Sequence, residues 1–404
     1  MKKIINYFLS KIFPALVILI VTRELYINME KSEFISYGLT FSSALLISNV
    51  LSLWISQATL RFFHNEFKSK IITLNLSYNL ILLSLWILTL FLSVFNNNDT
   101  ILVILLSISI TIYTNVNSLY QAKFDSLKVL KQELFRSILL ILLITLSIHI
   151  NNNNVSNKYV IIAFSISYII PVLFCTRDKI LFSSSAFFSG IKFNDVMTFF
   201  KFGIPMGLWG GVAACYPVIE RYFINANFNS TITADYYAVS ELYYRGIGLL
   251  FVPVIMYLHP LLMKEYDVNK SKFNNLLLKG AGGQIISLMV VILLGFSITP
   301  IFLKYYLPSL NHDFYYNSYI FALVPFMWQI AYLSHKGLEV TNHTVLMLFT
   351  LLFSLAVDCL LMYFFIDKEN IYSIVYIQVF SLFGYVLITS FLYFKGNKNE
   401  SFKN

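Results

Sequence analysis

The chain has 404 residues, of which 58% are hydrophobic and only 12% carry a charge. Soluble domains are ~45–50% apolar and ~25% charged, so water is not the main solvent of this protein. The formal net charge of +9 would indicate a nucleic-acid partner in a soluble protein. The positions of the cations indicate a membrane instead.

The predicted elements are apolar helices separated by short polar breaks. A helix that crosses the hydrocarbon core needs ~20 mostly apolar residues, and such stretches recur along the whole chain. The first follows Met1-Lys2-Lys3 and lacks a small-residue cleavage site, so we expect an uncleaved span and not a signal peptide. The predicted spans are 9–29, 34–60, 71–95, 100–121, 134–150, 157–176, 198–224, 232–262, 275–303, 314–335, 343–366 and 370–394.

The breaks between these spans alternate between basic loops and Asn-rich loops with little charge. Lys68 and Lys70 lie in one break, whereas the next runs from Asn96 to Asp99. With the N-terminus in the cytoplasm, most of the 29 lysines and arginines lie on the cytoplasmic side, as the positive-inside rule requires. The even number of spans returns the C-terminus to the same side. We therefore expect a multi-pass protein of the bacterial inner membrane with both termini in the cytoplasm.

The two halves of the chain are alike at the start of their first spans. Lys11-Ile-Phe-Pro14 opens one segment, and Lys201-Phe-Gly-Ile-Pro205 opens the other. Six spans separate the two copies, so they have the same orientation, as in transporters built from parallel repeats. The sequence predicts two six-helix lobes, residues 1–190 and 191–404.

Several short motifs resemble those of one family of membrane proteins. They are Ser56-Gln57-Ala58-Thr59-Leu60-Arg61-Phe62, Phe202-Gly203-Ile204-Pro205, Ile219-Glu220-Arg221-Tyr222-Phe223-Ile224, Ala234-Asp235-Tyr236-Tyr237-Ala238 and His259-Pro260. Together with the number of spans, they resemble the Wzx-type oligosaccharide flippases of the multidrug, oligosaccharidyl-lipid and polysaccharide exporter (MOP) superfamily. Glu220 stands where the family often has aspartate, so the carboxylate is retained on a longer side chain.

The resemblance implies an all-α integral membrane fold of about 12 transmembrane helices, in two six-helix lobes around a central cavity. It implies that undecaprenyl-pyrophosphate-linked oligosaccharide units, of O-antigen or capsule type, move from the cytoplasmic to the outer leaflet by alternating access. The implied partners are this lipid-linked oligosaccharide, the lipid bilayer, a polysaccharide polymerase and a chain-length regulator. No nucleic acid is implied.

Arginines within the spans are the candidates for binding pyrophosphate. A guanidinium binds phosphate oxygens through two parallel hydrogen bonds, and an ionisable residue deep in a span is a functional candidate by default. The substrate-binding candidates are Arg245, Arg23, Arg221 and Arg61. Other roles remain open: Arg245 can pair with Glu241 one turn earlier, Arg221 can snorkel to the outer surface, and Arg61 can anchor its span at the cytoplasmic surface.

Four acids within the spans are candidates for carrying a coupling proton or cation, or for balancing charge. They are Asp358, Glu241, Glu24 and Glu220. Glu24 and Glu220 each adjoin an arginine, which favours local charge pairing. Asp358 has no basic residue nearby in the sequence, so charge pairing explains it less well.

The seventh span carries Pro205 together with Gly203, Gly207 and Gly211 at intervals of four. Small residues at this spacing let helices approach closely. Proline and glycine also lower the cost of bending a helix. Pro205, Gly207 and Gly211 are the candidate hinge, with close packing as the alternative role.

Other functions remain open. A multidrug exporter of the same superfamily would use the acids for cationic compounds, and a flippase for a peptidoglycan or teichoic-type precursor would meet the same physical demands. A polytopic polysaccharide polymerase or ligase fits less well, because such enzymes present a large external loop and every outer break here is short. We therefore expect a transporter and not an enzyme.

No cofactor or metal is expected. Cys175, Cys215 and Cys359 lie far apart, without the paired spacing of a zinc or redox site. The sequence contains no nucleotide-binding G-x-x-x-x-G-K-[ST] motif. The energy must then come from an ion gradient, the membrane potential or consumption of the product, and the sequence leaves these alternatives open.

Overall fold

A computed structural model describes residues 2–63, 67–95, 98–151, 155–175, 192–341 and 343–401. Within these ranges every regular element is a helix. The helices are α1 (Lys2–Asn28), α2 (Lys31–Phe62), α3 (Lys68–Phe95), α4 (Asp99–Ala122), α5 (Ser126–Ile150), α6 (Asn157–Cys175), α7 (Phe193–Asn227), α8 (Ser230–Val268), α9 (Lys270–Tyr306), α10 (His312–Asn317), the 3₁₀ helix η2 (Ser318–Ala322), α11 (Leu323–Ser334), α12 (Lys336–Val340), α13 (Thr344–Phe365) and α14 (Tyr372–Ser401).

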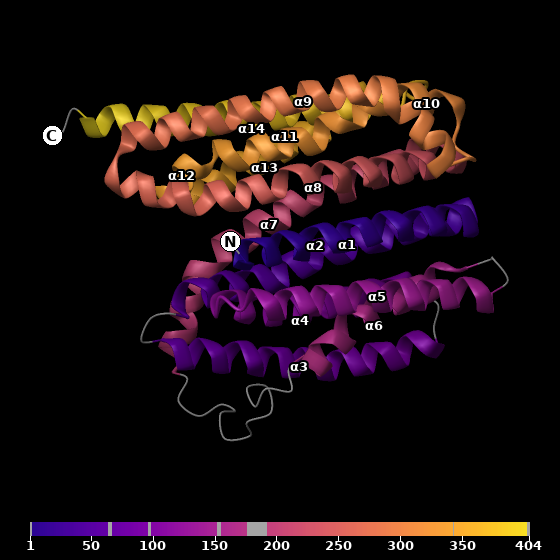
Figure 1. Cartoon of the computed structure of the whole chain (residues 1–404), viewed down its shortest axis with the longest axis horizontal. Helices are drawn as coiled ribbons and strands as arrows, with labels where there is room; N and C mark the ends of the chain where they lie inside the picture. The colour runs from indigo at the N-terminus through magenta and orange to yellow at the C-terminus, as the bar shows by residue number, and fades with distance from the viewer. Residues whose placement is uncertain are drawn as a thin grey trace. The chain divides into compact units, whose positions relative to one another are not determined.

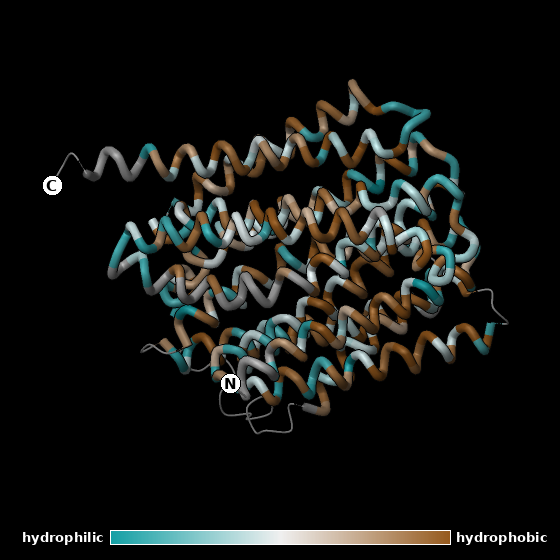
Figure 2. Tube along the Cα trace, turned by 45° about the horizontal axis from the view of Figure 1, so that its top comes forward, coloured by the Kyte–Doolittle hydropathy of each residue, from teal (hydrophilic) through white to brown (hydrophobic). Residues whose placement is uncertain are grey.

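Most of these helices have the length and composition of membrane spans. Among the described residues, nine helices are long and apolar enough to cross a bilayer. Figure 2 shows apolar residues along the helices and hydrophilic residues gathered where the chain turns. The nine helices, together with α1, α8 and the segmented stretch α10 to α12, follow the order of the predicted spans. The prediction of an all-α membrane fold with about 12 spans is confirmed.

The tenth predicted span, 314–335, is interrupted. It is divided into α10, η2 and α11, and α12 follows directly. Pro325 lies in the first turn of α11 and has no amide hydrogen to donate to the carbonyl of Phe321, so a continuous α-helix is disfavoured there. Hydropathy alone does not detect such an interruption, because the apolar character continues through it.

The chain divides into two compact units, Met1–Val218 and Ile219–Asn404. Their helices are shown in Figure 1. The division falls inside α7, so most of this helix belongs to the first unit and its last turns belong to the second. The six-helix lobes at 1–190 and 191–404 stay a prediction, because a compact unit is not the same as a moving lobe.

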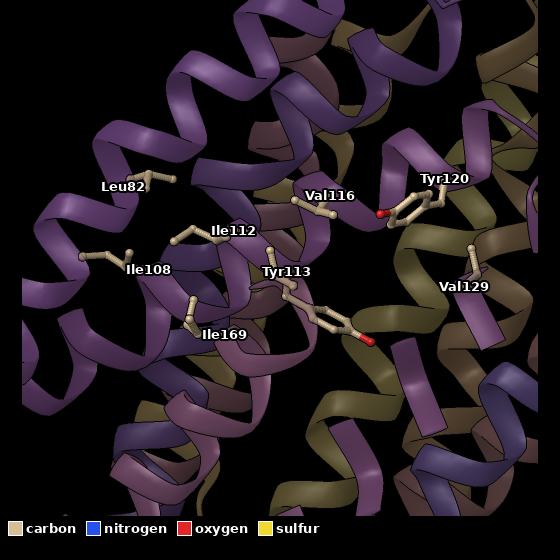
Figure 3. Packing of buried hydrophobic residues seen from close by; sticks show 9 residues of the cluster. Leu82, Ile108, Ile112, Tyr113, Val116, Tyr120, Val129 and Ile169 are labelled. Carbon is tan, nitrogen blue, oxygen red and sulfur yellow. The ribbon is translucent and has the colours of Figure 1, made fainter. Parts of the chain in front are cut away.

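In the first unit, α4 lies at the centre, packed against α2, α3 and α6. A cluster of buried apolar side chains fills the space around it (Figure 3), namely Leu82, Ile108, Ile112, Tyr113, Val116, Tyr120, Val129, Ile169 and Val172. These residues come from α3, α4, α5 and α6, so the cluster joins four helices. Close packing of this kind replaces the hydrophobic effect in a bilayer, where lipid chains are as apolar as the side chains.

Amide side chains add a second connection between α2, α3 and α4. Asn115 donates to Asn79 at 3.0 Å, Asn79 donates to Asn75 at 2.8 Å, and Asn75 donates to the Thr59 hydroxyl at 3.0 Å. All four residues are buried. Such bonds each stabilise a membrane helix interface by up to ~1–2 kcal/mol, so this chain of amides fixes the register of the three helices.

Candidate functional site

The predicted arginines of the seventh and eighth spans meet at one carboxylate in the second unit. Arg245 Nε lies 2.8 Å from Glu241 Oε1, and Arg221 Nη2 lies 3.3 Å from Glu241 Oε2. Glu241 and Arg245 are one turn apart on α8, whereas Arg221 reaches across from α7. The structure therefore brings together Arg221, Glu241 and Arg245, and the pairing of Arg245 with Glu241 expected from their spacing is present.

The short connection between α7 and α8 produces this arrangement. Asn229 ends the connection, and its side chain accepts a hydrogen bond of 2.9 Å from the Ile232 amide at the start of α8, as is typical of a helix N-cap. After this connection, α8 runs back beside the end of α7. The Tyr237 hydroxyl donates to the Arg221 carbonyl at 2.7 Å, and its ring lies 4.9 Å from the Arg221 guanidinium carbon.

Arg245 lies well inside α8, and its side chain is partly exposed. It is about 22 Å along α8 from the first residue, at 1.5 Å per residue, and the hydrocarbon core is ~30 Å thick. The side chain of Arg245 is 33% exposed, compared with 19% for Glu241 and 12% for Arg221. A charged side chain at this depth faces water or a protein cavity, because exposure to lipid is costly. Arg245 is thus the member of this group that a polar ligand can reach most easily.

A second group of polar residues in the same unit is buried. Glu220 on α7 accepts a hydrogen bond from the Tyr236 hydroxyl of α8, and the Ser381 hydroxyl of α14 donates to Asp358 Oδ1 of α13 at 2.8 Å. Asp358 is 0% exposed and Glu220 5%. Among the described residues, Asp358 Oδ2 has no hydrogen-bond partner. Asp358 therefore has one carboxylate oxygen that can accept a further hydrogen bond.

No protein-family model and no curated protein matches the sequence. Solved structures do match the fold. An inward-facing conformation of a multidrug resistance MATE family transporter of the MOP superfamily has a TM-score of 0.72 and 11% identity, covering 96% of this chain and 96% of that one. The chain has the same fold as this transporter.

Two further structures agree with this assignment. The outward-facing conformation of a multidrug resistance MATE family transporter has a TM-score of 0.70 and 11% identity, with coverage of 97% of this chain and 94% of that one. A MOP superfamily transporter from Pyrococcus furiosus, described by a reverse polarity of its binding pocket, has a TM-score of 0.67 and 13% identity, again covering 97% and 94%. At these identities the similarity establishes the fold alone.

The remaining predicted cations lie in the first unit. Arg23 Nη1 lies 2.6 Å from Glu24 Oε1, and both side chains are more than a third exposed. Arg61 is exposed at the end of α2, with its guanidinium carbon 4.8 Å from the Phe202 ring centroid. Charge pairing therefore accounts for Glu24, and a cation–π contact holds Arg61 against α7.

The glycines of the candidate hinge lie against α2. A Cβ atom at Gly207 would lie 3.3 Å from the backbone nitrogen of Trp54, and one at Gly211 would lie 2.6 Å from Val50 Cγ2. A Cβ at Gly203 would overlap the Trp54 carbonyl. Pro205 lies between Gly203 and Gly207 on the same helix. The structure therefore shows close packing at these positions, and bending there stays a prediction.

One buried ion pair, in α5 of the first unit, was not among the predicted site residues. Arg136 Nε lies 3.1 Å from Glu133 Oε2, and both side chains are less than a tenth exposed. The Arg136 guanidinium carbon is 5.6 Å from the Tyr113 ring centroid and 4.8 Å from that of Tyr168. Hydropathy predicts a span that starts at residue 134, which leaves Arg136 at the cytoplasmic surface, whereas α5 begins at Ser126.

A helix-start signal would have located this pair. The side chain of Asp125 accepts a hydrogen bond of 3.1 Å from the Lys128 amide, the N-cap arrangement that aspartate favours. An N-cap at Asp125 places Arg136 about 15 Å along the helix and so well inside it. The structure describes no group of three or more His, Cys, Asp or Glu residues, within its described ranges, that could hold a metal ion.

Proposed function

We propose that this chain is a flippase, which carries undecaprenyl-pyrophosphate-linked oligosaccharide units from the cytoplasmic to the outer leaflet by alternating access. The observation that carries the proposal is the group Arg221, Glu241 and Arg245, in which the partly exposed Arg245 lies deep in a span of a transporter fold. The MOP neighbours include inward-facing and outward-facing conformations, which supports alternating access as the mechanism.

The chemistry of the substrate explains why guanidinium groups are needed. Each unpaired hydroxyl that enters hydrocarbon costs several kcal/mol, and an unpaired phosphate costs more. A wet cavity with a guanidinium removes much of this cost, because the arginine fork binds phosphate oxygens bidentately. Arg245 has the exposure that this role requires. Glu241 holds both guanidinium groups in place and limits their repulsion.

The buried acids provide a means of coupling. Glu220 and Asp358 lie on different helices in the same unit, and Asp358 has a carboxylate oxygen with no hydrogen-bond partner among the described residues. We propose that these acids carry the coupling proton or cation. The membrane potential is a second energy source, because one negative charge that moves outward down a potential of ~100 mV releases about 2.3 kcal/mol.

Multidrug export is the second candidate function. The observation in its favour is the presence of these same two buried acids, which suit a cationic compound, in a fold shared with MATE multidrug transporters. The difference in exposure favours the flippase, since Arg245 is accessible whereas Glu220 and Asp358 are buried.

Reconstitution separates the two functions. The purified chain is placed in liposomes with a fluorescent undecaprenyl-pyrophosphate oligosaccharide in both leaflets, and a membrane-impermeant reagent quenches the outer leaflet. A flippase makes the protected fraction accessible over time, while ethidium transport stays at the level of empty liposomes. Transport of ethidium without movement of the lipid would show that the chain is a multidrug exporter.

A deletion strain tests the same function in the cell. Loss of the protein should leave lipid-linked repeat units on the cytoplasmic leaflet and deprive the polysaccharide polymerase of substrate. Normal surface polysaccharide in that strain would contradict the proposal. The proposed orientation, with both termini in the cytoplasm of the inner membrane, predicts that reporter fusions after Asn98 and Asn229 lie outside, and a cytoplasmic signal at both would overturn it.

A further inference from the structure

The first part of α7 is bound closely to α2 over three helical turns. Gly203, Gly207 and Gly211 face α2, and a Cβ atom at Gly207 would lie 3.4 Å from the Trp54 Cβ. A Cβ at Gly211 would lie 3.9 Å from the Val50 Cβ. Such an approach leaves no room for a side chain at these positions and is typical of close interfaces between membrane helices. This part of α7 therefore has little freedom to bend.

The cytoplasmic end of α7 is held by aromatic rings and by an ion pair. Phe199 is fully buried, with its ring centroid 5.2 Å from that of Phe62 on α2 and 5.9 Å from that of Phe67, just before α3. Asp195 Oδ1 lies 2.9 Å from Lys70 Nζ of α3. The segment from Asp195 to Gly211 thus contacts α2 or the start of α3 on each of its successive turns.

The end of α7 belongs to a different unit. The first unit ends at Val218, directly after Pro217, which is the second proline inside α7. Beyond this point, Glu220 and Arg221 bond to residues of α8. Proline has no amide hydrogen for the carbonyl four residues earlier, so Pro217 lowers the cost of bending between Ala213 and itself.

We propose that Pro217 is the hinge of α7, and that residues 193–216 form a strap that stays bound to α2 and α3 throughout transport. The proposal rests on the proposed transport function, since it concerns the movement that transport requires. It differs from a hinge at Pro205, because Pro205 lies between two glycines that pack against Trp54. Movement at Pro217 would shift Arg221, four residues later, together with its partner Glu241 relative to the strap.

Disulfide cross-linking tests whether the strap stays bound. In a chain whose native cysteines are changed to alanine, Val50→Cys with Gly211→Cys places two Cβ atoms about 3.9 Å apart, within the range of disulfides. Maleimide labelling of free thiols measures the cross-linked fraction before and after a reducing agent. Transport by the oxidised protein is expected to lie within about twofold of the reduced protein, whereas a strap that must detach would be arrested by the cross-link.

Arrest of transport in the oxidised form, with recovery on reduction, would overturn the proposal. Trp54→Cys with Gly207→Cys, whose Cβ atoms lie about 3.4 Å apart, repeats the test at a second turn if the first double variant fails to fold. The expected result is the same, because the strap is treated as one body.

Matched proline substitutions test the position of the hinge. Pro217→Ala restores a helical hydrogen bond and should lower the transport rate about fivefold, the equivalent of the ~1 kcal/mol that such a bond contributes. Pro205→Ala is the control and should leave the rate within about twofold. Wild-type activity in Pro217→Ala, or an equal loss in both variants, would refute the assignment.

The failure of this inference is distinguishable from failure of the proposed function. A wild-type chain that moves ethidium but not the lipid-linked oligosaccharide refutes the flippase proposal alone. The cross-linked and reduced proteins are then compared by ethidium transport, because the strap and hinge are properties of the movement and not of the substrate.

Discussion

Replacing Arg245 by lysine separates the two roles open to this residue. Arg245 Nε lies 2.8 Å from Glu241, and the same carboxylate is 3.3 Å from Arg221. Lysine keeps the positive charge beside Glu241 but cannot donate two parallel hydrogen bonds to a phosphate. A hydrogen bond to a charged group contributes ~1.5–3 kcal/mol. If Arg245 donates two hydrogen bonds to the phosphate in the rate-limiting state of transport, the loss of one of them should lower the rate about ten- to a hundredfold.

Stability measurements distinguish this effect from a folding defect. Arg245→Lys should change the free energy of unfolding by less than ~1 kcal/mol, since the ion pair is retained and partly exposed. Glu241→Gln removes the carboxylate that Arg221 and Arg245 share. Breaking a buried pair costs ~3–5 kcal/mol, and with side chains 12% to 33% exposed we expect the lower end of this range.

The assay is flipping of the fluorescent lipid-linked oligosaccharide, normalised to the amount of folded protein in the liposomes. Wild-type rates in Arg245→Lys would show that only the charge of this residue matters. Recovery of full activity in the double variant Glu241→Gln with Arg245→Gln would show that Arg245 balances Glu241 and does not bind pyrophosphate. Either result would refute the reasoning and leave Arg23 as the better candidate.

Three other predictions follow from the packing and the buried charges. Asp358→Asn keeps an acceptor for the Ser381 hydroxyl, so the protein should stay folded but lose acceleration by an imposed proton or sodium gradient; a gradient response equal to wild type would exclude Asp358 from coupling. Gly203→Ala should lower the unfolding free energy by ~1–3 kcal/mol, because the added methyl group overlaps the backbone of α2, whereas Gly246→Ala, which has open space around it, should be neutral or stabilising by up to ~1 kcal/mol in thermal unfolding. Glu133→Gln should destabilise α5 by ~3–5 kcal/mol, because it leaves Arg136 buried without its carboxylate; near wild-type stability in Glu133→Leu with Arg136→Met would mark a structural pair, while loss of transport in that stable double variant would mark a functional one.

Much of the fold was predictable because a segment that crosses a bilayer must be apolar and helical, and both properties can be recognised in the sequence. Backbone polar groups in hydrocarbon must be satisfied within the segment, so each long apolar stretch becomes a helix, and the order of spans can be predicted from hydropathy alone. The start of α5 at Ser126 was missed for the same reason, since the first turns of this helix carry polar residues that hydropathy treats as loop. Pro325 likewise interrupts a stretch whose apolar character is continuous.

The charged site was predictable only in part. The spacing of Glu241 and Arg245 determines their pairing, because residues four apart lie on one face of a helix. That Arg221 shares the same carboxylate depends on the return of α8 beside α7, and that Glu220 bonds to Tyr236 depends on the same contact.

The sequence by itself determined which segments enter the membrane and which residues within them are ionisable, because both follow from local composition and helical periodicity. Only the tertiary structure decided that Glu241 bridges two arginines, that Asp358 meets Ser381, and that the glycines of α7 face Trp54 and Val50. These contacts join residues on different helices. Their partners are set by how the helices pack, and in a bilayer that packing depends on shape and hydrogen bonding more than on hydrophobicity.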